Sequence, residues 1–203
     1  MPFPTTNAQT ELQAVNEILA SVGQAPVTTL DQTNPDVAIA YDTLIQVSRE
    51  VQAEGWTFNK EFEYPFVPDT NNEILIPNNV LELDLTPDYR DRDSVRRNGK
   101  LYDRTNHTFE WEDDEVLCDV VWYFDWVDLP VPIQDYIVAR AATITSSRII
   151  GDSGQYQMLQ QREAYCRAMA LEYECNQGEY TFFGHPRGAN YYNSYEPYKA
   201  LYR

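Results

Sequence analysis

The sequence has 203 residues, a length that fits one domain or one domain with a large insertion. Hydrophobic residues make up 43% and charged residues 23%, both close to globular averages, which excludes a disordered chain. The formal net charge of −17 argues against a surface that grips DNA or an anionic membrane, because like charges repel.

Two helices are predicted in the first 55 residues. The first begins with Thr10 as its N-cap, and apolar residues recur at helical spacing until Gly23, which supplies a left-handed C-terminal residue. The second begins with Asn34 as its N-cap and Pro35 at the first helical position, and it ends at Gly55. The short turn between the two helices favours a helical hairpin.

The segment 60–128 is predicted to be rich in β-strands. Leucines alternate with acidic residues in 80–85, as they do in a half-buried strand. The dipeptide Asn98-Gly99 predicts a hairpin turn between the strands on either side of it. The other strand candidates are residues 109–112 and, as the longest one, residues 116–127.

Two further helices follow the β-rich segment. One starts after Pro130 and Pro132 and is closed by Gly151, and the other runs from near Ser153 to Gly178. The apolar residues at helical spacing in the last helix are Leu159, Tyr165, Cys166, Met169 and Tyr173.

The last stretch of the chain has no helical or strand period and is rich in aromatic residues broken by glycine and proline. Tyrosine buries a large area and keeps a polar tip, so such a segment suits docking onto another protein. We expect a contact with a neighbouring subunit or another partner, and the open alternative is that the segment wraps back on its own domain. The candidate interface residues are Tyr180, Phe182, Phe183, Tyr191, Tyr192, Tyr195, Tyr198 and Tyr202.

The order of these elements predicts an α+β fold. Residues 1–59 and 129–178 are expected to form a four-helix α-helical domain, into which an antiparallel β domain of residues 60–128 is inserted. Residues 179–203 form the irregular Tyr-rich C-terminal arm of this prediction.

Enzymatic motifs are weak. The string Gly151-Asp152-Ser153-Gly154 matches the short sequence around the serine of chymotrypsin-like proteases, but a triad also needs a positioned base. The two histidines, His107 and His185, lie in no recognisable catalytic context. We interpret the string as the end of one helix and the start of the next, with Ser153 as the N-cap.

Acidic clusters could serve hydrolysis or calcium binding, but both have simpler interpretations. The run of four acids at 112–115 fits a solvated turn better than a pair of carboxylates that converge on a sugar. The spacing of Asp88, Asp91 and Asp93 is not that of an EF-hand, and interleaved arginines indicate a charge-balanced loop.

The cysteines indicate neither a metal site nor a disulfide framework. Cys118, Cys166 and Cys175 form no CxxC pair, and their number is odd, so reduced thiols are expected. No secretory signal and no stretch of about 18 apolar residues is visible in the sequence. The sequence therefore predicts no catalytic residue, no cofactor and no metal ligand.

Six segments of the chain carry a family resemblance. They are residues 11–23, 26–30 and 54–59, the tripeptide Tyr102-Asp103-Arg104, and residues 133–151 and 163–180. These segments resemble the tail tubular protein A (head-to-tail adaptor) family of T7-like short-tailed phages. The N-terminal third carries the most specific similarity, the β-rich region is only loosely similar, and the Tyr-rich arm departs from the family.

This resemblance implies a structural virion protein that is assembled in the host cytoplasm and resides in the virion tail. It implies a ring, expected to have twelve copies, that joins the portal protein to the tail nozzle protein (tail tubular protein B) and seats tail fibres. DNA would pass through the ring without specific binding, along a channel whose acidic wall repels it, and no membrane would be bound.

Two other functions remain open at this point. One is a virion-associated cell-wall hydrolase, which would need converging carboxylates. The other is a tail protein that binds host glycans through Trp111, Trp122 and Trp126, although these residues are more typical of a core or an interface.

Overall fold

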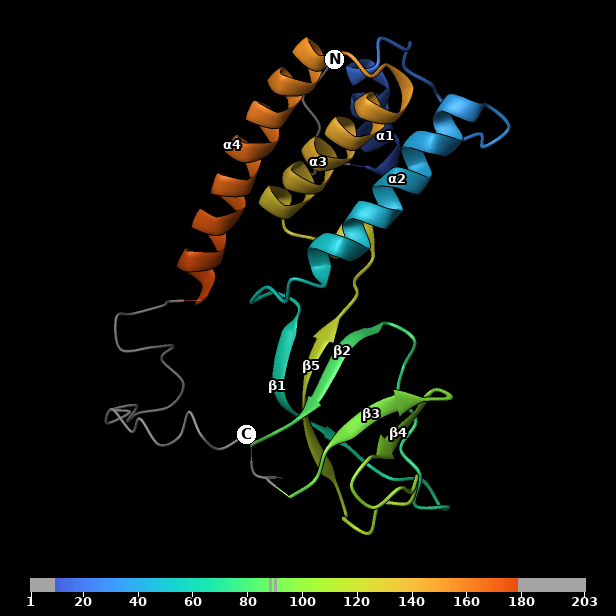
Figure 1. Cartoon of the computed structure of the whole chain (residues 1–203), viewed down its shortest axis with the longest axis vertical. Helices are drawn as coiled ribbons and strands as arrows, with labels where there is room; N and C mark the ends of the chain where they lie inside the picture. Colours follow the sequence, from blue (N-terminus) through green and yellow to red (C-terminus); the bar gives the residue numbers. More distant parts are fainter. Residues whose placement is uncertain (1–9, 88, 90, 179–203) are drawn as a thin grey trace, which may run out of the picture. The chain divides into compact units, whose positions relative to one another are not determined.

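The structure, a computed structural model, describes residues 10–87, 89 and 91–178 (Figure 1). It confirms the predicted α+β class, with helices at both ends of the described chain and antiparallel strands between them. The elements in chain order are α1 (Glu11–Ser21), α2 (Pro35–Gln52), β1 (Lys60–Phe66), β2 (Val80–Leu85), β3 (Ser94–Arg97), β4 (Lys100–Asp103), β5 (Val116–Trp122), a 3-10 helix (Trp126–Asp128), α3 (Val131–Ile149) and α4 (Ser153–Gly178).

The described chain contains a helical unit, within residues 10–54 and 124–174, and a β unit, within residues 55–123. Each unit has its own buried core and is described by itself. The domain boundaries after residues 59 and 128 stay predictions.

Local signals place α1 and α2 as the sequence predicts. Thr10 and Gln13 form a reciprocal capping box at the start of α1, and Asn34 accepts a hydrogen bond from the backbone of Asp36 at the start of α2. Gly23 and Gly55 follow the two helices with left-handed backbone angles, φ +74° in each case.

The core of the helical unit lies where α3 packs against both α1 and α2. The large side chains from these three helices are completely buried there, so their apolar faces, rather than helix propensity, stabilise the unit. The main contributors are Ile18, Leu19, Leu44, Ile133, Tyr136 and Ile137.

In the β unit, a three-stranded antiparallel sheet has the order β1-β5-β2, and β3 and β4 form a separate hairpin. The hairpin turns at Asn98 and Gly99, both with positive φ, as predicted. The predicted strand 116–127 is too long, because β5 ends at Trp122. The predicted strand at 109–112 is wrong: Glu110 makes only an isolated bridge, and the Trp111 amide donates to the Asn72 carbonyl.

Two buried amide side chains hold the chain where it passes between helices and strands. At the end of α2, the Gln52 amide accepts from the Phe124 N–H at 2.8 Å and donates to the Phe124 carbonyl at 3.2 Å. In the β unit, Asn59 Nδ2 donates to the Trp122 carbonyl at 2.8 Å, and Asn59 Oδ1 accepts from the Trp56 N–H at 2.9 Å. Each amide therefore joins the outgoing and the returning segment of chain.

We expect Gln52→Leu to lower the free energy of unfolding by about 1–3 kcal/mol, because the backbone groups of Phe124 lose their partner in a partly buried position. Urea denaturation followed by circular dichroism measures this. Gln46→Leu, on the exposed side of the same helix, is the matched control and should change stability by less than about 0.5 kcal/mol. Equal effects of the two substitutions would contradict the role assigned to Gln52.

Candidate functional site

The eight aromatic residues predicted as an interface, Tyr180, Phe182, Phe183, Tyr191, Tyr192, Tyr195, Tyr198 and Tyr202, lie outside the described residues. Their contact with a partner stays a prediction. The surfaces and polar clusters of the described chain are the other candidate sites.

The protease-like string is a helix junction. Gly151 has φ +70°, and the Asp152 carboxylate accepts from the backbone N–H groups of Gly154 and Gln155, at 3.4 and 3.1 Å. Asp152, and not Ser153 as predicted, thus caps α4, because the aspartate carboxylate accepts both amides. The described part of the helical unit contains no histidine that could activate Ser153.

The acidic segments of the β unit are engaged in ion pairs. Asp113, in the middle of the acidic run, pairs with Arg92. Asp93 pairs with Arg104 at 2.8 Å, which agrees with a charge-balanced loop. Asp88 lies outside the described residues. No group of three or more His, Cys, Asp or Glu residues is arranged to hold a metal ion in the part of the chain that the structure describes.

The tryptophans considered for glycan binding belong to the core. Trp111, Trp122 and Trp126 are 2%, 9% and 7% exposed, and the Trp111 indole donates to the Leu101 carbonyl at 3.1 Å. A sugar stacks on an accessible ring face, so this burial argues against the glycan-binding alternative.

The tripeptide that carries part of the family resemblance builds a loop. The buried Asp103 carboxylate accepts from the backbone N–H of Thr105 at 2.7 Å and of Asn106 at 2.9 Å. The Asn106 side-chain amide also donates to it, at 2.9 Å. Tyr102 packs edge-on against Phe109, with ring centroids 4.8 Å apart. These residues position the chain after β4 and offer no reactive group.

Helix α4 is exposed along most of its length. It has 26 residues, yet only the side chains of Cys166 and Ala170 are buried. Tyr165 and Met169, which belong to the predicted apolar face, are 58% and 42% exposed, and Met158 is 72% exposed. The predicted face is therefore divided into a narrow buried seam and an exposed apolar flank.

A polar network joins α4 to its neighbours. The Tyr136 hydroxyl accepts from Arg140 at 3.2 Å and from Arg167 at 3.3 Å, and both arginines lie within 3.7 Å of Glu54. Arg140 also pairs with Glu50 at 3.2 Å. Because carboxylates balance both cations, this cluster positions helices and does not form an open anion site.

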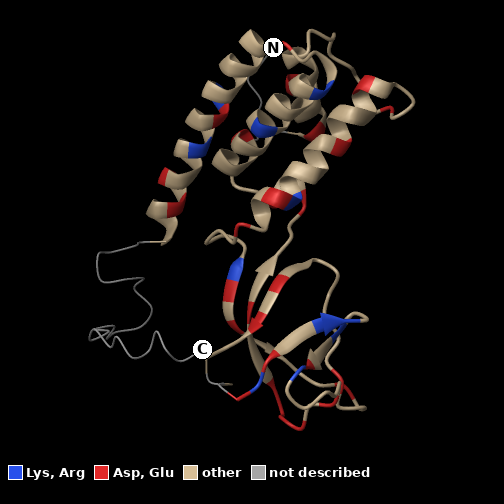
Figure 2. Cartoon of the chain, in the orientation of Figure 1, with Lys and Arg blue, Asp and Glu red and all other residues tan. Residues whose placement is uncertain are grey.

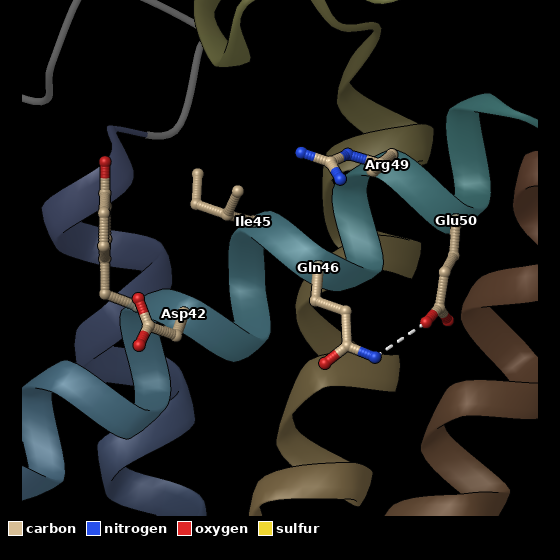
Figure 3. A pocket seen from close by; sticks show the side chains of 6 residues that line it. Asp42, Ile45, Gln46, Arg49 and Glu50 are labelled. Atoms are coloured by element: carbon tan, nitrogen blue, oxygen red, sulfur yellow. Dashed lines mark hydrogen bonds between the residues drawn. The ribbon is translucent and has the colours of Figure 1, made fainter. Parts of the chain in front are cut away.

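A second surface is a shallow hollow on the outer face of α2 (Figure 3). It combines half-buried apolar side chains with charged ones, and Gln46 donates to Glu50 across its edge at 2.9 Å. An open hollow of mixed chemistry is more typical of a protein contact than of an enclosed ligand site. The lining residues are Tyr41, Asp42, Ile45, Gln46, Arg49 and Glu50.

The β unit carries an acidic sheet face, defined here as Glu82, Asp84 and Asp119, and Figure 2 shows acidic residues along these strands. Asp84 lies directly opposite Asp119 in the β2–β5 register, and the Glu63 N–H donates to the Asp119 carboxylate at 3.1 Å. Like charges opposite each other destabilise a sheet, so this face concentrates negative charge at some cost in stability.

Exposed helical and acidic surfaces thus characterise the described chain, as expected of a protein that assembles with others. A family model described as tail tubular protein matches residues 12–180. The chain is also 27% identical, over 173 residues, to Tail tubular protein A of Klebsiella phage KP34, covering 82% of this chain and 88% of that relative.

The chain belongs to the tail tubular protein family, and it is a structural protein of a phage virion tail. No helix among the described residues is both long and apolar enough to cross a membrane.

The thiols should differ in reactivity. Burial raises the pKa of Cys118 to about 12 and also raises the pKa of Cys166, whereas Cys175 is exposed. A raised pKa lowers the fraction of reactive thiolate. At pH 8 we expect one thiol per folded chain to react rapidly with an aromatic disulfide reagent, and all three to react after unfolding. Cys175→Ser should remove the rapid phase, and its persistence would contradict the assigned burial.

Proposed function

We propose that the protein is a subunit of the head-to-tail adaptor ring, which connects the portal to the tail nozzle and seats tail fibres. The family match supports a place in the tail. The main support for a role as an adaptor-ring subunit is the exposure of α4, a long helix with only two buried side chains. Helices in proteins are stabilised mainly by packing, so an exposed helix of this length offers surface to other chains.

A closed ring needs heterologous contacts, in which two different faces of the subunit meet. The helical unit has two unlike surfaces, the exposed flank of α4 and the hollow on α2. This difference supports assembly into a ring. We propose twelve copies, so that the ring matches the symmetry expected of the portal.

The Tyr-rich arm is the proposed attachment segment for the portal or the nozzle protein. Residues 179–203 contain two acidic and three basic residues, so the negative charge of the protein resides in the rest of the chain. An arm with many aromatic residues and little net charge can dock on an acidic surface without strong repulsion.

The acidic sheet face is proposed to line the DNA channel. A wall of carboxylates repels phosphates and offers DNA few points of attachment during ejection. Glu82 and Asp84 on β2 are exposed, so substitutions at these two positions can test whether this face repels DNA.

The arm can be tested with the portal protein of the same phage. A chain that ends at Gly178 should keep its helical circular dichroism but bind the portal or the nozzle protein at least about tenfold more weakly, because the aromatic contacts are lost. Replacing Tyr191, Tyr192, Tyr195 and Tyr198 together by serine should weaken binding as well, whereas replacing them by phenylalanine is the control that keeps the rings. Normal binding of both partners by the truncated chain would refute the role of the arm.

The channel proposal predicts that virions carrying Glu82→Lys and Asp84→Lys eject DNA more slowly, because lysines attract phosphates. The same two charge reversals at Glu112 and Asp114, in the exposed turn, serve as the control. Ejection triggered in vitro and followed with a DNA-binding dye gives the rate. An unchanged rate in the β2 variant would count against a channel lined by this face.

A further inference from the structure

The exposed flank of α4 has the spacing of a coiled-coil seam. Met158, Arg162, Tyr165, Met169 and Glu172 follow one another at intervals of four, three, four and three residues, and all five are exposed. Such alternation places them in one row along the helix. We call this row the α4 stripe. With a rise of 1.5 Å per residue, it extends over about 21 Å.

The stripe is separate from the seam with which α4 packs on its own unit. Tyr165 and Met169 each precede a buried residue, Cys166 and Ala170, by one position. One residue corresponds to about 100° of rotation around a helix, so the stripe faces about a quarter turn away from the buried seam. Helices in bundles commonly have neighbours on two adjacent sides, and this geometry provides α4 with a second such side.

We propose that the α4 stripe pairs with the α4 stripe of a second copy of this chain in antiparallel orientation. When Tyr165 lies opposite the partner's Met169, Arg162 lies opposite the partner's Glu172, because both pairs have the same midpoint at position 167. The two-fold axis then repeats both contacts. The dimer thus contains two aromatic–methionine contacts and two ion pairs.

Charge complementarity identifies a second copy as the occupant. Arg162 has its guanidinium 5.8 Å from the Tyr165 ring centroid, and no described carboxylate forms an ion pair with it, although Asp135 is close enough to interact electrostatically. The stripe holds one cation and one carboxylate at positions that match only when the second helix is reversed. A parallel pair would place Arg162 against the same arginine of the partner, which is unfavourable.

The proposed dimer goes beyond the adaptor ring and does not depend on it. A stripe of this length buries less than the roughly 800 Å² per partner of a stable interface, so the dimer should form in the micromolar range and dissociate on dilution. A two-fold contact uses the same surface on both copies, whereas a cyclic ring uses unlike surfaces. The dimer would therefore be a state of the free protein that keeps α4 covered before assembly.

Sedimentation velocity of the full chain, from about 5 to about 500 µM, tests the pairing. The wild-type chain should shift from monomer to dimer. Arg162→Glu alone and Glu172→Arg alone should each weaken dimerisation about tenfold or more, because each creates two repulsive pairs, and the double variant should restore it. Gln160→Glu, on the other side of α4, adds negative charge away from the stripe and should leave dimerisation unchanged.

Three outcomes would overturn the proposal. A full chain that stays monomeric throughout would do so, and dimerisation of the Gly178 truncation alone would then show that the C-terminal arm covers the stripe. A dimer that Arg162→Glu weakens but Glu172→Arg does not would indicate a heterologous contact, such as one with the α2 hollow. Failure of the double variant to dimerise, with unchanged circular dichroism, would exclude the antiparallel register. None of these outcomes bears on portal binding.

Discussion

The insertion of the β unit between α2 and α3 depends on two side-chain amides, which hold the segments where the chain leaves and re-enters the helices. The Gln52 amide forms hydrogen bonds with both the N–H and the carbonyl of Phe124. The Asn59 amide accepts from the Trp56 N–H and donates to the Trp122 carbonyl. A side-chain amide has both a donor and an acceptor, so it can pair with a backbone carbonyl and a backbone N–H at the same time. A buried backbone group that is left unpaired costs about 1–3 kcal/mol. The outgoing and returning segments are therefore neighbours, so the β unit of residues 55–123 can be inserted without interrupting the packing of α1, α2 and α3.

Features with a local cause could be predicted from the sequence. The caps at Thr10 and Asn34 and the Asn98-Gly99 turn depend on a few adjacent residues, and the structure confirms them. The predictions failed where the local structure depends on residues that are far away in the sequence. The strand predicted to reach residue 127 ends at Trp122, because the Phe124 backbone pairs with Gln52, which is 72 positions away. Similarly, periodicity shows that α4 is amphipathic in part but not which of its apolar residues the other helices cover.

The candidate sites show the same division between local and distant causes. The sequence already favoured a helix junction for the protease-like string and solvated or charge-balanced loops for the acidic clusters, and it left glycan binding through three tryptophans as an open alternative. The structure assigns them to a helix junction, to ion pairs and to the core, and it shows exposed surface on α4 and α2 instead. A protein that presents long exposed helical faces and a strongly acidic sheet acts through assembly, which is consistent with its membership of the tail tubular protein family.

The central claim, that this protein forms the adaptor ring on the portal, is tested most directly by negative-stain electron microscopy. The purified protein is mixed with the portal protein of the same phage, and the complexes are averaged in side and end views. The account predicts an additional ring of density at the narrow end of the portal, with the same rotational symmetry. Intact portals without added density, at protein concentrations well above those that saturate similar assemblies, would contradict it.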